Sequence, residues 1–131
     1  MLRGGRVAKS VDELLVYQKA IEAADDVSTI LKRDSFSRDL RLKSQLGASS
    51  ERVASLMAEG FSQKTDRHFA QYLYTARGSS SETRTQLRIA LTRSHVTPAD
   101  VERISRRYNE IEKMLTGLIK HLNRDDRKQR G

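Results

Sequence analysis

The sequence predicts an all-α protein folded as an up-down-up-down antiparallel four-helix bundle. Apolar side chains recur at three- and four-residue steps in four successive stretches, and nothing alternates as a strand does. The links between these stretches are only about four to seven residues long, which forces neighbouring helices to run antiparallel. A chain of 131 residues suits one domain with one core.

The first helix is expected over residues 11–32. Ser10 followed by Glu13 has the spacing of a capping box. One helical face then carries Leu14, Tyr17, Ile21, Ala24 and Leu31. The segment KRDSFS, residues 32–37, ends the pattern.

The second helix is expected over residues 38–59, with Ser37 or Ser35 as its cap. Gly60 follows, where a residue in the left-handed conformation would close the helix. The predicted inner face consists of Leu42, Leu46, Ser49, Val53 and Leu56 or Met57.

The third helix is expected from Thr65 or Asp66, either of which can cap it, to about residue 94. Its predicted inner stripe is Phe69, Leu73, Ala76, Ser80, Thr83, Leu87, Ala90 and Leu91. Gly78 lies in the middle, where glycine costs about 1 kcal/mol relative to alanine. The close approach of another helix beside Ala76, Gly78 and Ser80 would explain it; a tolerated local weakness is the alternative.

The fourth helix follows Thr97, a good cap, with Pro98 in the first turn and Asp100 placed to favour the helix dipole. Its apolar residues alternate steps of three and four, which is a heptad seam. They are Val101, Ile104, Tyr108, Ile111, Leu115, Leu118 and Leu122.

Three parts are therefore predicted: a basic arm over residues 1–9, the bundle over 10–123 and a charged tail over 124–131. No apolar run is long enough to span a membrane. The basic start has no apolar segment behind it, so a signal peptide is not indicated. With no cysteine in the chain, a reducing, cytoplasmic location is expected.

Positive charge is in excess and unevenly distributed. The net charge is +8, and 17 of the 25 basic residues are arginine, whose planar fork matches phosphate. The segment 10–31 carries five acidic residues against one lysine, while 65–94 carries five arginines against two acids. One hypothesis is that an acidic helix of one subunit faces a basic helix of the next, head to tail.

The other hypothesis is that the remaining positive charge binds RNA or DNA phosphates. Arg77, Arg84 and Arg88 follow one line along the third helix. The predicted nucleic-acid-binding residues are Arg77, Arg84, Arg88, Arg93, Arg103, Arg106 and Arg107. A solvated face that keeps the protein soluble is the alternative for each of them.

Several short motifs together resemble one known family. They are VYQKA at 16–20, SQ at 44–45, SLMAEG at 55–60, Phe69, Leu73, ARGS at 76–79, Glu82 and QL at 86–87. The chain resembles the proteins encoded in intervening sequences of bacterial 23S ribosomal RNA genes. Their superfamily includes the accessory variability determinant protein of diversity-generating retroelements. The resemblance spans residues 14–122 and departs from the family pattern at Leu56, usually asparagine, and at Ser80, usually leucine.

This resemblance implies a cytosolic bundle, a homo-oligomer that is a pentameric ring in several members, and no catalysis. It also implies, for the retroelement branch, work with a reverse transcriptase and structured RNA. Among the matching residues, Glu59, Gly60, Gly78 and Glu82 are expected to serve oligomer contacts or helix packing.

Catalytic and cofactor chemistry is not indicated. None of His68, His95 and His121 has a glutamate three residues before it, as a di-metal bundle requires. No serine lies in a nucleophile motif and no glycine-rich phosphate loop follows a strand. We therefore expect no enzyme, metal or cofactor, but an oligomer that binds structured RNA by charge and shape. A protein adaptor or structural oligomer that does not bind nucleic acid is the alternative.

Overall fold

Four long helices make up a computed structural model that describes residues 8–130, with side chains for residues 8–124. They are α1 (Leu15–Leu31), α2 (Leu40–Phe61), α3 (Asp66–Thr92) and α4 (Pro98–Arg130). Two short 3₁₀ helices accompany them, η2 (Val11–Glu13) before α1 and η3 (Asp34–Arg38) between α1 and α2. Most of the predicted basic arm lies outside the described residues, as do the side chains of the predicted tail beyond Arg124, although the α4 backbone continues to Arg130.

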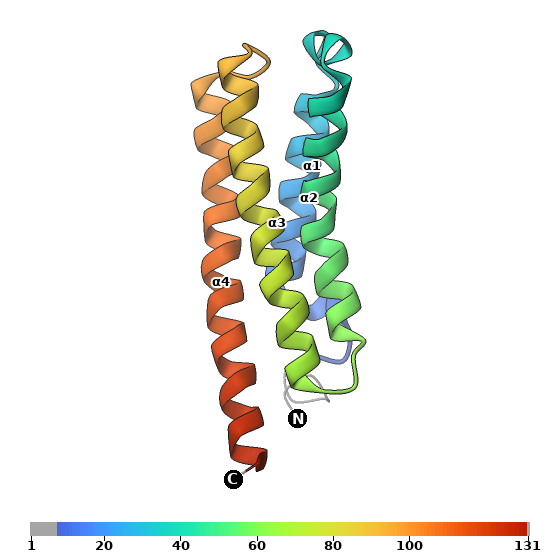
Figure 1. Cartoon of the computed structure of the whole chain (residues 1–131), viewed down its shortest axis with the longest axis vertical. Helices are drawn as coiled ribbons and strands as arrows, with labels where there is room; N and C mark the ends of the chain where they lie inside the picture. The colour runs from blue at the N-terminus through green and yellow to red at the C-terminus, as the bar shows by residue number, and fades with distance from the viewer. Residues whose placement is uncertain (1–7, 131) are drawn as a thin grey trace.

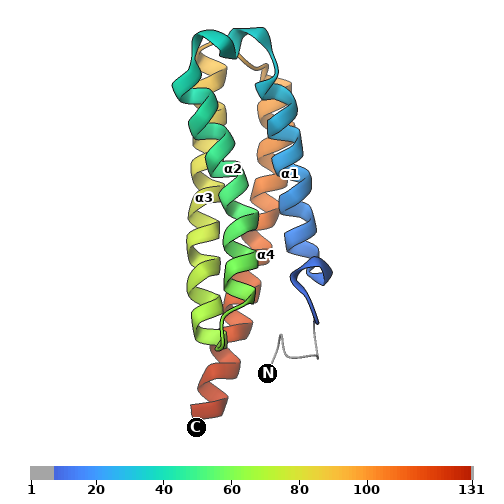
Figure 2. The same cartoon turned by 90° about the vertical axis from the view of Figure 1, so that its right-hand side faces the viewer.

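The helices run alternately up and down and lie side by side as a bundle (Figure 1). Helix α3 packs against α2 on one side and α4 on the other, and α1 closes the bundle between α2 and α4 (Figure 2). Residues 8–130 contain no strand. The all-α bundle predicted from apolar spacing and short links is confirmed.

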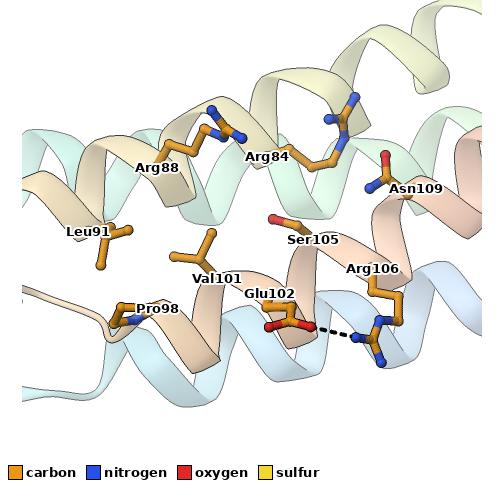
Figure 3. A pocket seen from close by; sticks show the side chains of 9 residues that line it. All are labelled: Arg84, Arg88, Leu91, Pro98, Val101, Glu102, Ser105, Arg106 and Asn109. Carbon is orange, nitrogen blue, oxygen red and sulfur yellow. Dashed lines mark hydrogen bonds and ion pairs between the residues drawn. The ribbon is translucent and has the colours of Figure 1, made fainter.

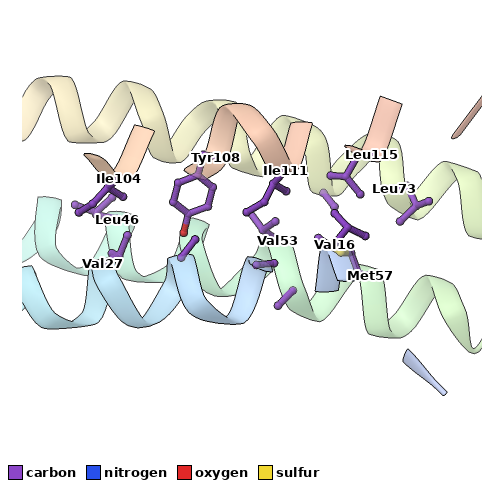
Figure 4. Packing of buried hydrophobic residues seen from close by; sticks show 14 of the residues in the cluster. Val16, Val27, Leu46, Val53, Met57, Leu73, Ile104, Tyr108, Ile111 and Leu115 are labelled. Carbon is purple, nitrogen blue, oxygen red and sulfur yellow. The ribbon is translucent and has the colours of Figure 1, made fainter. Parts of the chain in front are cut away.

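The core is a column of mainly aliphatic side chains (Figure 4) that also includes Phe36, Phe69 and Tyr108. Helix α4 contributes the most regular part, and five of its seven predicted seam residues are fully buried. Val101, at the start of the seam, is only partly buried. Near its end, Ile119 is buried while Leu118 is only partly buried. The fully buried members from α4 are Ile104, Tyr108, Ile111, Leu115 and Leu122.

The predicted inner face of the first helix is correct at its ends, where Leu14 and Leu31 are buried, and wrong between them. Ile21 is 47% exposed, and Tyr17 is only partly buried. Helix α1 carries two apolar stripes, and the stripe with the steadier heptad spacing and small alanines faces the core. It consists of Val16, Ala20, Ala23, Val27 and Ile30.

Helix caps follow the sequence at two of the four helices. Thr65 caps α3 by accepting the backbone N–H of His68, and Thr97 and Asp100 cap α4 reciprocally. The other cap predictions are wrong. The Ser10 side chain caps nothing, and neither Ser35 nor Ser37 caps α2, which begins after Asp39. The 3₁₀ turns delay the start of α1 and of α2, so these serines do not stand at the first helical turn.

Gly60 does not close α2 in a left-handed conformation; it lies inside the helix, and that prediction is wrong. A Cβ added there would lie 2.6 Å from Cβ of Tyr72 and 3.3 Å from the backbone oxygen of Phe69. Gly60 therefore allows α2 and α3 to approach closely. Gly78 does not have this role within the chain, because a Cβ there would meet no atom within 4 Å.

The α1–α2 and α3–α4 connections are tied together at one end of the bundle. His95 bonds Ser35 through Nδ1 and Asp39 through Nε2, both at 2.9 Å, and its ring stacks on buried Phe36. The bond to His95 lowers the pKa of Asp39. A lowered pKa means that this contribution to stability is present at neutral pH and is lost as the pH falls through the folded-state value.

A second tie at this end joins Arg33 to Asp100. The guanidinium donates to both carboxylate oxygens, at 2.7 and 3.3 Å, and lowers the pKa of Asp100 further than the N–H and hydroxyl of Thr97 do. Asp100 is thus both the cap of α4 and the anchor for the end of α1. The two ties fix how the tops of α3 and α4 meet α1.

Two glycine substitutions should change stability in opposite directions. Gly60→Ala is expected to lower the free energy of unfolding by about 1–3 kcal/mol, because the new methyl group overlaps α3. Gly78→Ala is expected to raise it by about 1 kcal/mol, because the site is open and alanine favours helix. Thermal unfolding followed by circular dichroism measures both. A Gly60→Ala protein as stable as the parent would contradict the close α2–α3 approach.

Candidate nucleic-acid interface

Most of the seven predicted phosphate-binding arginines are already paired with acidic groups of the same chain. Their partners separate them into three places: the α1–α4 edge, the tied end of the bundle, and the outer side of α3 and α4. Each place borders a hollow in the surface, and the one between α3 and α4 is lined by three arginines and one acidic residue. The arginines that pair with carboxylates are Arg84, Arg93, Arg103, Arg106 and Arg107.

Arg103 and Arg107 serve the α1–α4 edge. Arg107 Nε lies 2.7 Å from Asp26 Oδ2, and its Nη1 lies 3.2 Å from Glu22. Arg103 reaches Asp26 at 3.8 Å and Asp100 at 3.5 Å. Glu22 and Asp26 of the acidic first helix therefore face basic side chains of their own chain, which removes them from the proposed charge pairing between subunits.

Arg93 belongs to the tied end, where it lies 3.2 Å from Asp39. Arg106 makes an exposed pair with Glu102 one turn earlier on α4, at 2.7 Å. An exposed pair of this kind contributes little stability and exchanges easily for another partner. Arg106 is thus available to a ligand in a way that Arg93 is not.

Arg84 is held at the α3–α4 contact by Glu112. Its Nε and Nη2 donate to the two carboxylate oxygens at 2.7 and 2.8 Å, and the Ser80 hydroxyl donates to the same carboxylate at 2.8 Å. The hydrogen bonds that Arg84 donates to Glu112 raise the pKa of Arg84. This bidentate contact orients the guanidinium along the seam between the two helices.

A groove of about 470 Å³ runs between the outer sides of α3 and α4 (Figure 3). Arg84, Arg88 and Arg106 line it with a single acidic residue, Glu102. Among the residues with described side chains, Arg88 has no ion pair or hydrogen-bond partner. The other lining residues are Leu91, Pro98, Val101, Ser105 and Asn109.

An adjoining hollow of about 330 Å³ continues the groove toward the far end of α4, since Asn109 lines both. Arg77 and Lys113 supply positive charge there, against Glu112. Arg77 donates to Thr116 Oγ1 at 3.0 Å and lies over the exposed ring of Tyr74, 5.1 Å from its centroid. We call the groove and this hollow together the α3–α4 groove.

Comparison with known proteins decides the family. The sequence pattern of the 23S rRNA-intervening sequence protein family matches residues 12–117, most of the chain. The chain belongs to this family. No curated protein matches its sequence.

The bundle is also similar to a solved structure. It is a protein of unknown function from the S23 ribosomal protein family of Bacteroides thetaiotaomicron, with a TM-score of 0.73 and 21% identical residues. The match covers 81% of this chain and 99% of the other. At this identity the likeness supports the bundle fold alone.

The α3–α4 groove is also lined by polar residues of α4 that were not predicted from the sequence. Ser105, Asn109 and Lys113 recur at four-residue steps on the side of α4 that borders α3. Their spacing beside the heptad seam was a usable signal. Arg77, Arg84, Arg88 and Arg106 come together in the α3–α4 groove, whereas Arg93, Arg103 and Arg107 lie elsewhere.

The residues expected to serve packing or oligomer contacts do not form one site. Glu82 bonds Arg52 of α2 at 2.9 Å and Gln86 at 3.3 Å. Gln86 in turn accepts from buried Ser49, which accepts from Thr83. This polar layer joins α2 to α3 beside the aliphatic core. Glu59 and Gly78 are exposed, and their part in an oligomer stays a prediction.

The described residues hold no group of three or more histidines and acids able to bind a metal ion. The chain Ser35–His95–Asp39 has the composition of a nucleophilic triad, but its geometry suits a clamp. The His95 side chain is 8% exposed, its ring is covered by Phe36, and Asp39 is shared with Arg93. None of the described helices is apolar over a length that could cross a membrane.

Two neighbouring arginines of α4 should differ in their effect on folding. Arg107→Ala is expected to lower the free energy of unfolding by about 1–2 kcal/mol, because Asp26 Oδ2 is buried and, among the described side chains, would keep only the more distant Arg103 as a cation. Arg106→Ala should change it by less than about 0.5 kcal/mol, since its pair is exposed. Urea unfolding compares them. Equal stability of the two variants would contradict the structural role of Arg107.

Proposed function

We propose that this family member is a non-enzymatic protein that binds structured RNA, by charge and shape, through its α3–α4 groove. The observation that carries the proposal is the positive charge left beside that groove after the ion pairs within the chain are counted. Arg88 has no partner among the described side chains, and Arg106 has only an exposed one. The family's name, which refers to 23S rRNA, supports RNA rather than DNA.

The shape of the groove supports a polyanion as ligand. Its basic side chains are spread between Arg88 and Arg77 on α3, eleven residues or about 16 Å of helix. A row of cations over this length suits successive phosphates of one strand better than a single small anion. No aromatic side chain lines either part of it, which favours recognition by charge and shape.

A homo-oligomer is the second part of the proposal. Leu40 is 65% exposed and borders a shallow hollow between α1 and α2 that Leu31, Gly47 and Ala48 also line. Ile21 is exposed on the same pair of helices. We propose that another copy covers this apolar surface. A single-chain mass by light scattering, at a protein concentration of tens of micromolar, would contradict this proposal. That the oligomer is a pentamer and that a reverse transcriptase is a partner are proposals that rest on the family resemblance.

Binding to a structured RNA, measured by fluorescence anisotropy of the full chain, tests the RNA-binding function. The affinity should fall steeply between about 50 and about 300 mM salt, because added salt weakens the attraction between the basic side chains and the phosphates. Arg88→Ala should weaken binding about three- to tenfold and reduce the salt slope by about 1. Arg67→Ala removes the same charge at the far end of α3, outside the groove, and should change affinity less.

Two results would overturn this function. No binding at low salt, or an affinity that does not respond to salt, would remove the electrostatic argument. A protein partner that is recovered from lysate equally well after nuclease treatment would favour the alternative, a protein adaptor. Loss of that partner after nuclease would support assembly through RNA.

A further inference from the structure

The α3–α4 groove changes in chemical character along its length. At the end near the α3–α4 connection it is lined by Leu91, Pro98 and Val101 (Figure 3). Leu91 and Val101 are only partly buried and Pro98 is exposed, so apolar area remains open to a ligand. The basic side chains of Arg84 and Arg88 follow directly along α3. A ligand that uses the whole groove must therefore present an apolar face next to an anionic group.

We infer that this part of the groove holds an unpaired nucleotide of the bound RNA, its base against Leu91, Pro98 and Val101 and its phosphate at Arg88. This inference rests on the proposed RNA-binding function. A regular duplex keeps its base faces stacked inside and offers phosphates and riboses outside, so it would leave the apolar end of the groove empty. A bulged or looped nucleotide exposes both parts.

The volume of the groove and the polar groups that line it suit one nucleotide. About 470 Å³ lies within the range of small-ligand sites. Ser105 and Asn109 lie between the apolar end and the adjoining hollow, where a hydroxyl and an amide can hydrogen-bond a base edge or ribose. The planar guanidinium of Arg88 can stack on a base or bind a phosphate in a bidentate manner.

An amphipathic acidic helix fits the groove less well. A helix docked in a groove needs apolar contacts at about every third or fourth residue along its length. Here the apolar lining is confined to one end, and the rest is Arg84, Arg88, Arg106, Ser105 and Asn109. The short apolar floor and the flanking guanidinium groups favour one base with its phosphate.

The test compares two RNAs of equal length and charge, a perfect duplex and the same duplex carrying one bulged nucleotide. The full chain should bind the bulged RNA roughly tenfold more tightly at the same salt. Val101→Ser and Pro98→Ala should each reduce this ratio toward one without changing the salt slope. Arg88→Ala should weaken binding of both RNAs. Leu15→Ser, which removes an exposed apolar side chain of α1 away from the groove, should preserve the ratio.

Melting curves first establish that each variant is folded; Pro98→Ala keeps the test valid if Val101→Ser unfolds, because Pro98 is exposed. Equal, salt-dependent affinity of the parent for both RNAs overturns this inference and leaves the proposed function standing. No salt-dependent binding of either RNA overturns both. If adenosine monophosphate binds as tightly as the bulged RNA, the groove is a site for a free nucleotide. If Val101→Ser weakens the binding of an acidic amphipathic peptide but not that of RNA, the groove is a peptide site.

Discussion

An arginine that is bonded to a carboxylate on a neighbouring helix binds a phosphate less readily. Carboxylates of the chain therefore compete with phosphates of a ligand for the guanidinium groups on the surface of the bundle. Arg107 is committed to Asp26 and Glu22, and Arg93 to Asp39. The sequence does not distinguish the seven predicted arginines. The fold does, because some of them are held in ion pairs and others remain free to bind a ligand. Arg88 and Arg106, which have no carboxylate partner on another helix among the described side chains, both line the α3–α4 groove, whereas Arg84 is held there by Glu112.

The same helix that forms one wall of the groove also sets the geometry of the bundle. Helix α3 packs closely on α2 through Gly60 and the Ser49–Thr83–Gln86 layer, and on α4 through Ser80 and the Arg84–Glu112 pair. At both contacts these small or hydrogen-bonded side chains add to the packing of the apolar core. The outer side chains of α3 and α4 are consequently held at fixed separations. A binding surface supported in this way is expected to be rigid rather than formed on contact.

The fold could be predicted from sequence because it depends on local periodicity and short links. The seam of α4 and the Thr65 and Thr97 caps are signals within one helix. The face of α1 was not predictable, because its two apolar stripes differ only in regularity, and the choice between them is made by the other helices. Gly60 was misread for a similar reason: a glycine that ends a helix and one that admits a neighbour look alike in sequence.

The candidate site was predictable in charge but not in detail. The line of Arg77, Arg84 and Arg88 follows from helical spacing alone. Which arginines remain available depends on partners such as Glu112 and Asp26, which lie 28 and 81 residues away along the chain from Arg84 and Arg107. Such pairings require the register between helices, which no local pattern specifies.

Ultraviolet cross-linking of the full chain to a bound structured RNA, with the cross-linked peptides located by mass spectrometry, tests the central claim most directly. The internal pairing of arginines predicts cross-links in α3 and α4, between Arg77 and Arg88 and between Pro98 and Thr116. Cross-links confined to α1 and α2 would contradict it, because the RNA would then bind away from the α3–α4 groove.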